Sequence, residues 1–237
     1  LEMAVHHIGE EIFFYIAVPR TYEQIFEKQV HGFFPNAEVE KTRDYNIFNP
    51  EGVSIGAYVK LSANPILPFK TYQNLQANPL SAIATSLSKL EKEGEGAAIQ
   101  ILMRPSHRND LKKLAQKTAK EMQSGFSFKD ALSRANKSPK KPKEGEQQQT
   151  RVVTPFEEEI IKGLQSKATK PTFDANVRIV VSAGNEMRAK QLLGDIEGSL
   201  AQFTANEMNG LKTANMSSGA LKKLLFNFSF RIFDNSQ

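Results

Sequence analysis

The sequence predicts an α+β protein, built on a ferredoxin-like split βαβ module that is followed by a second, variant α/β module. Stretches with the two-residue alternation of strands recur between stretches with the 3.6-residue period of amphipathic helices. Over residues 10–104 these segments follow the order β-α-β-β-α-β, which is the order of the ferredoxin-like unit. Order resumes after residue 154 with α-β-α-β-(α)-β. We therefore expect antiparallel sheets with helices packed on one face.

The first module opens on an apolar run over residues 11–18, which predicts a strand closed by Pro19. A helix over residues 21–33 follows from its apolar spacing, and Pro35 comes directly after it. The same periodicities predict four later elements, which are an edge strand over 37–41, a strand over 53–61, a helix over 79–90 and a strand over 97–104. The helix over 79–90 begins with an N-cap and proline signal at Asn78-Pro79.

A third helix begins at Asn109, with lysines on one side and Leu and Ala on the other. Residues 134–150 contain nothing larger than Ala to bury, which predicts disorder. The chain is therefore divided into three parts. These are a ferredoxin-like module over residues 8–123, a basic, partly disordered linker over 124–154 and a second α+β module over 155–237.

The second module begins with a helix whose first turn contains Glu157 to Glu159, where the helix dipole favours carboxylates. Within its longest helix, Gly194 and Gly198 indicate close packing against a neighbouring element. The remaining predicted elements are a strand over 172–183, that long helix over 185–203, a short element over 208–212 and a strand over 225–233.

The composition excludes several classes of site. The chain has 237 residues and no Cys, which excludes disulfides, thiolate metal sites and a Cys nucleophile. It contains no Gly-Lys pair for a phosphate loop and no G-x-G-x-x-G after a strand. The four His lack ligand spacing. We accordingly expect no enzyme activity, no cofactor, no metal and no small-molecule substrate. No apolar run reaches the length of a membrane span.

The net charge of +5 is unevenly distributed. Residues 104–143 carry 12 positive and 3 negative side chains, or +9, which leaves −4 elsewhere. A basic helix face beside a basic segment is typical of contact with a nucleic-acid backbone. A solvated face with a solubilising linker accounts for the same pattern, and both interpretations stay open. The candidate DNA-binding residues are Arg104, Arg108, Lys112, Lys113, Lys117 and Lys120.

Several short motifs lie along the chain. They are Phe34-Pro35-Asn36-Ala37-Glu38-Val39-Glu40 with Asp44-Tyr45, the strand Ala98 to Pro105 ending in Arg-Pro, a charged insert at 137–149, Val177 to Ala183, and Phe230-Arg231. Together they resemble an N-terminal region found in bacterial conjugation proteins. In that family the region precedes a HerA/FtsK-like DNA-translocating ATPase of type IV secretion coupling type. The resemblance spans about residues 10–233 and offers no catalytic residue to carry over.

This resemblance implies a non-catalytic accessory domain of a conjugative DNA-translocating ATPase, with the ATPase following Gln237 in the parent chain. The expected partners are that ATPase domain, DNA and a second copy of the chain. The expected location is the cytoplasm, with the parent at the inner face of the membrane. Leu1-Glu2-Met3 resembles a cloning scar before an internal fragment. The alternative function is a purely structural module for self-association or protein docking, without nucleic-acid binding.

Overall fold

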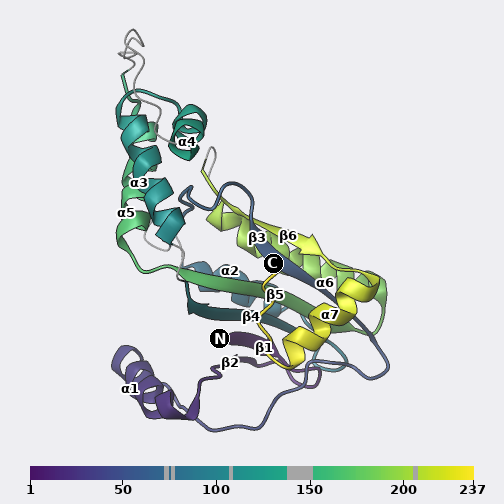
Figure 1. Cartoon of the computed structure of the whole chain (residues 1–237). Helices are drawn as coiled ribbons and strands as arrows, with labels where there is room; N and C mark the ends of the chain where they lie inside the picture. Colours follow the sequence, from purple (N-terminus) through teal and green to yellow (C-terminus); the bar gives the residue numbers. More distant parts are fainter. Residues whose placement is uncertain (72–74, 76–77, 107–108, 138–151, 205–207) are drawn as a thin grey trace.

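The computed structural model describes residues 1–71, 75, 78–106, 109–137, 152–204 and 208–237, which form one six-stranded sheet with helices on both faces and a helical extension at one end (Figure 1). The strands lie in the order β2-β1-β4-β5-β3-β6, and every neighbouring pair is antiparallel. Their bounds are β1 Glu2–Val5, β2 Ile12–Tyr15, β3 Val53–Leu61, β4 Gly96–Pro105, β5 Phe173–Ala183 and β6 Leu211–Asn215.

Several of the helices begin where the sequence supplies capping groups. Asn78 accepts a hydrogen bond from the backbone of Leu80, with Pro at the first helical position. Thr154 and Glu157 form a reciprocal capping box. The helices are α1 Glu23–Phe33, α2 Pro79–Leu87, α3 Asn109–Gln123, α4 Phe128–Asn136, α5 Pro155–Thr169, α6 Glu186–Ser199 and α7 Ser218–Ser229, with short 3-10 turns η1 Arg20–Tyr22 and η3 Leu200–Phe203.

The α+β class is confirmed, but the strands pair differently from the arrangement that we expected. Strand β5, from the second half of the chain, lies between β4 and β3, so the strands of residues 10–104 do not form a sheet of their own. Ile99 of β4 pairs with Ile179 of β5, and Ala57 of β3 pairs with Ile179 from the other side. Apolar alternation specifies which face of a strand is buried but not which strand lies beside it.

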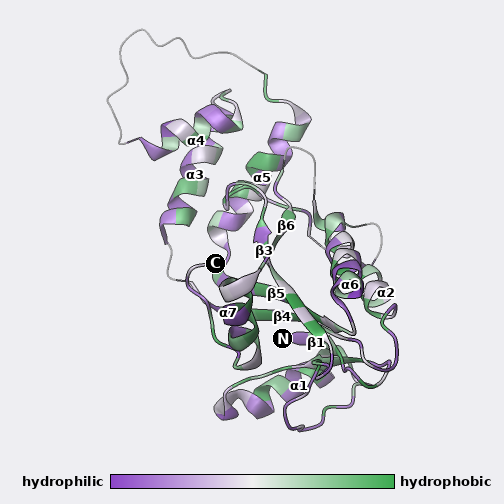
Figure 2. Cartoon of the chain, turned by 90° about the vertical axis from the view of Figure 1, so that its right-hand side faces the viewer, coloured by the Kyte–Doolittle hydropathy of each residue, from purple (hydrophilic) through white to green (hydrophobic). Residues whose placement is uncertain are grey.

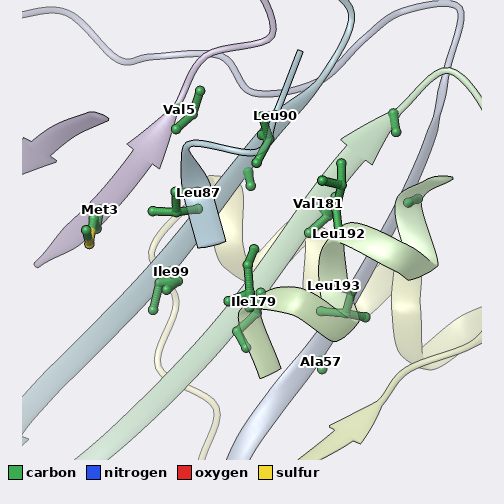
Figure 3. Packing of buried hydrophobic residues seen from close by; sticks show 14 of the residues in the cluster. Met3, Val5, Ala57, Leu87, Leu90, Ile99, Ile179, Val181, Leu192 and Leu193 are labelled. Atoms are coloured by element: carbon green, nitrogen blue, oxygen red, sulfur yellow. The ribbon is translucent and has the colours of Figure 1, made fainter. Parts of the chain in front are cut away.

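Helices cover both faces of the sheet, not one. Figure 2 shows the sheet between α2 and α6 on one side and α7 on the other. The α2–α6 side holds the larger core, in which Ile179 and Leu192 are fully buried (Figure 3). The α7 side buries Tyr58, Leu224 and Phe228 together with Ile47. Strand β5 is therefore buried in both directions, as a central strand between two layers must be, although its α7 side carries the polar residues Asn176, Arg178 and Ser182 beside Val180.

Residues 225–233, predicted as a strand, belong mostly to helix α7. The alternating Phe residues suggested a period of two, yet Leu224 and Phe228 are buried at a spacing of four while Phe226 and Phe230 are exposed. Over so short a length, alternating Phe residues do not distinguish the strand period of two from the helix period of 3.6. Packing against the sheet then stabilises the helix.

Three further elements differ from the prediction. The suspected cloning scar is part of β1, which is buried between β2 and β4. Residues 37–41 form no strand, and the short element near residue 208 is strand β6, which starts at Leu211. Gly194 and Gly198 show no close packing, because a β-carbon at either position would have no atom of another element within 4 Å.

Helices α3, α4 and α5 form a helical arm that leaves the sheet after β4 and returns at β5 (Figure 1). The two strands are paired up to their arm-side ends, where Pro105 lies opposite Phe173. The arm has its own core, which joins helices that the predicted division had assigned to three separate parts. Residues 128–136, within the predicted linker, are helical, and residues 138–151 lie outside the described part. The core residues include Ala115, Met122, Ala131, Ile161 and Leu164.

Candidate functional site

Three of the predicted DNA-binding residues form an exposed stripe along α3. Lys113, Lys117 and Lys120 are spaced i, i+4, i+7 and so share one face, over about 10 Å at 1.5 Å per residue. The opposite face buries Ala115, Ala119 and Met122 in the arm core. Within the described ranges, none of the three lysines has an ion-pair partner. The stripe is therefore a free row of positive charge.

The other three predicted residues do not complete this stripe. Lys112 is half-buried beside it, and Arg108 lies outside the described residues. Arg104 is held by contacts within the chain: Nη2 donates to Asn235 Oδ1 at 2.7 Å and lies 3.4 Å from Asp174 Oδ2. Its guanidinium also stacks 4.2 Å from the ring centroid of Phe233. Arg104 thus fastens the C-terminal segment to β5.

Helix α4 extends the basic surface of the arm. Lys129 and Lys137 are exposed on it, and the site prediction did not include them. Arg134 is different, because its Nε donates to Glu121 at 2.9 Å and its guanidinium stacks 4.1 Å from the Phe126 ring centroid. Arg134 therefore fastens α4 to α3. The signal that distinguishes these cations is the presence of a carboxylate and a ring nearby, which sequence spacing alone does not give.

Lys167 of α5 fixes the arm to the loop that follows β3. Its ammonium donates to the carbonyl oxygens of Pro65 at 2.9 Å and Leu67 at 2.6 Å. Burial lowers the pKa of Lys167 from 10.5 to about 8. Gly163, one turn earlier, lies against Pro68, since a β-carbon there would come within 2.7 Å of the proline ring. The base of the arm is therefore packed against the loop that follows β3.

The lowered pKa of Lys167 predicts a pH dependence of stability. Between about pH 8 and 10.4 the folded lysine is neutral while the unfolded lysine still binds a proton, so the free energy of unfolding rises with pH, by at most about 1.4 kcal/mol per pH unit. Urea denaturation across this range should show that rise reduced in Lys167→Met. The exposed Lys162→Met on the same helix should keep it; equal slopes in all three proteins would contradict the assignment.

A buried arginine organises the face of the sheet under α7. Arg178 of β5 is fully buried, and its Nη1 donates to Gln100 Oε1 at 2.7 Å and to the carbonyl of Asn227 at 2.9 Å. Its Nη2 donates to Asn176 Oδ1 at 3.2 Å and to the carbonyl of Ile232. Two of these acceptors belong to the end of α7 and the turn after it. The cation therefore caps the carbonyl end of a helix, which the helix dipole favours.

The Gln100 side chain connects Arg178 to a buried carboxylate by hydrogen bonds. Gln100 donates to Glu2 Oε1 at 2.7 Å, and Glu2 lies 2.9 Å from the Nε of Arg231. Arg231 also donates to Asp44 at 2.8 Å, and that hydrogen bond lowers the pKa of the Asp44 carboxyl. A connected network of this kind ties β1, β4, β5 and α7 together, and removing one member leaves its neighbours without partners.

Strand β2 and helix α1 form an exposed apolar surface, which the sequence patterns did not indicate. No residue of α1 is buried, and Phe33 is 78% exposed. The apolar spacing that predicted this helix was correct, but its apolar face is turned to solvent. We call this the β2–α1 surface; its large exposed side chains are Phe13, Phe14, Ile16, Tyr22, Ile25, Phe26, Phe33, Phe34 and Val39.

Neither metal-type clusters nor membrane-length helices occur in the described part of the chain. No three His, Cys, Asp or Glu side chains gather there in a way that could hold a metal ion. None of the helices described is both long and apolar enough to cross a membrane.

Comparison with known proteins identifies the family. Searches against curated proteins and against solved structures each found no match. The model of DUF8128, described as a domain of unknown function, matches residues 1–233. Since that match covers nearly the whole chain, the protein belongs to the DUF8128 family.

Proposed function

We propose that the chain is a non-catalytic accessory domain of a DNA-translocating ATPase, of the kind found in bacterial conjugation and type IV secretion. In this proposal the domain works in the cytoplasm beside the ATPase domain of its parent chain. Its arm contacts DNA through Lys113, Lys117 and Lys120. The observation that carries the DNA contact is the stripe of these three exposed lysines, which lack carboxylate partners within the described residues.

The physical basis is release of counterions from the DNA backbone. Each lysine that neutralises a phosphate releases condensed cations, so binding weakens linearly on a log–log scale as salt increases. Flexible ammonium groups on one helix face bind phosphates as point charges and read no base sequence. We therefore expect weak, sequence-independent binding, with a dissociation constant in the micromolar range or above, about 10⁻⁶–10⁻⁴ M at physiological salt.

A triple substitution on α3 tests this contact. Lys113→Gln, Lys117→Gln and Lys120→Gln together should weaken binding to a fluorescent DNA duplex at least about tenfold at low salt, because three phosphate contacts are lost. The slope of log affinity against log salt should fall in magnitude by about 2.7, at about 0.9 per contact. Fluorescence anisotropy between about 50 and 200 mM salt measures both quantities.

A matched control separates local contact from net charge. Lys89, Lys92 and Lys190 are exposed and pair with Asp195, Glu10 and Glu186 respectively. Changing these three to Gln removes the same charge elsewhere and should leave the slope nearly unchanged. If the α3 variant binds DNA as tightly as the unaltered protein, the proposed interface is wrong.

A further inference from the structure

The β2–α1 surface lies at an edge of the sheet and is open to solvent. Strand β2 pairs with β1 on one side only. Among the described residues, no backbone hydrogen bond reaches its outer edge. Helix α1 follows β2 in the chain and lies beyond that edge, away from α2 and α6 (Figure 1). A strand with an unpaired outer edge and an unpacked amphipathic helix are thus neighbours on one side of the molecule.

Although β2 is only four residues long, its outer edge lacks two of the features by which monomeric proteins protect exposed strands. Ile12–Tyr15 contains no Lys and no Pro, and Phe14 is 58% exposed. Edge strands of monomers are usually blocked by charge, proline or a covering element, because an open row of N–H and C=O groups pairs readily with another strand. The outer edge of β2 therefore offers N–H and C=O groups that can pair with another strand.

The apolar area is large enough for a stable interface. Its nine large side chains are each between 39% and 78% exposed. At about 100 Å² of exposed surface each, they expose about 900 Å² in total. A standard protein interface buries about 800 Å² from each partner. The β2–α1 surface thus matches one side of such an interface.

Charge on this surface favours a second copy of the chain as its occupant. Residues 12–34 carry Arg20 and Lys28 against Glu23 and Glu27, so their net charge is zero with His neutral. Two identical neutral surfaces face each other without net repulsion. Binding to an anionic membrane would call for an excess of Lys and Arg on the helix, which α1 lacks.

We propose that two copies of this chain associate through the β2–α1 surface, with the outer edges of their β2 strands paired antiparallel about a two-fold axis. Antiparallel pairing of identical edges is self-complementary, so the same residues meet on both sides and the assembly closes as a dimer. The Phe and Ile side chains of α1 then become buried against the partner copy. This association does not depend on whether α3 contacts DNA.

Light scattering on the full chain tests the proposal. Over concentrations of about 1 μM to 1 mM, which cover weak to moderate affinities, the mass should rise from 26.5 kDa toward twice that value. Phe26→Glu and Phe33→Glu on α1, and Phe14→Lys on β2, should each raise the dissociation constant at least tenfold. All three side chains are exposed, and circular dichroism should therefore show unchanged folding.

The matched control is Phe230→Glu, which changes a 67% exposed Phe directly after α7. It should leave the dimer intact; if it alone abolishes association, the interface is on α7 and the proposal is overturned. A protein that remains monomeric at the highest concentration also overturns it. Flotation of such a monomer with phosphatidylcholine vesicles would assign the surface to lipid instead.

Discussion

Replacing Arg178 by Met is expected to lower the free energy of unfolding by about 3–5 kcal/mol, the cost of removing one partner from a buried charged network. Methionine fills much of the volume but supplies no donor. The side-chain oxygens of Gln100 and Asn176 would then lose a donor, as would the two carbonyls near the end of α7. The Asn227 carbonyl and Asn176 Oδ1 each keep a backbone donor, whereas Gln100 Oε1 and the Ile232 carbonyl keep none among the described residues. Each buried acceptor left without a partner costs about 1–3 kcal/mol. Urea denaturation measures the loss.

A lysine at the same position is the control that separates charge from geometry. Arg178→Lys keeps the positive charge, yet a single ammonium on a shorter stem cannot reach from Gln100 to Ile232 as the two Nη groups do. It should recover only part of the stability. Amide exchange should also rise first in the last turn of α7, whose carbonyls Arg178 caps. A Met variant within about 1 kcal/mol of the unaltered protein would contradict this role.

Gly96→Ala is expected to cost about 3 kcal/mol, at the upper end of the usual penalty for overpacking. A β-carbon at Gly96 would overlap the carbonyl oxygen of Ile47 and lie 2.9 Å from its carbonyl carbon. Both obstacles are backbone atoms, and Ile47 is itself 1% exposed, so neither side can move aside cheaply. The segment that crosses the start of β4 would have to shift. Thermal or urea unfolding measures the loss.

The same substitution at Gly194 should have the opposite sign. Gly194 lies inside α6, and a β-carbon there meets no atom of another element within 4 Å. Alanine is therefore expected to stabilise the protein by about 0.5–1 kcal/mol through its helix propensity. If both alanine variants lose stability equally, the close approach of Ile47 is not what requires glycine at position 96.

Local features of the fold could be predicted from the sequence because they depend on neighbouring residues. The cap at Asn78, the helix start with Glu157 in its first turn and the strand over residues 172–183 are each specified within a few positions, and the structure has all three. The alternation of β5 indicated only one of its two buried faces: Ile179 and Val181 lie in the larger core, while Arg178 and Ser182 are buried on the opposite side. Such patterns report burial, and burial is what periodicity measures.

Pairing and solvent exposure could not be predicted, because both depend on distant residues. The insertion of β5 between β4 and β3 is fixed by packing on two faces, which no local pattern encodes. The helix predicted over residues 21–33 exists, but its apolar face points outward in α1, against the usual expectation. Similarly, Arg104 is held by Asp174, Asn235 and Phe233, which the fold brings beside it, whereas Lys117 is exposed.

The position of the arm between two paired strands has a consequence for the order of folding. Pairing β4 with β5 requires the chain to close a loop over residues 106–172, and the entropy lost grows with the length of a flexible loop. Helix pairs form from local contacts on faster timescales than long-range ladders. Because α3 leaves the sheet and α5 returns to it, a folded arm already holds the two strand ends near each other. We therefore expect the arm to fold first and to speed the pairing of β4 with β5.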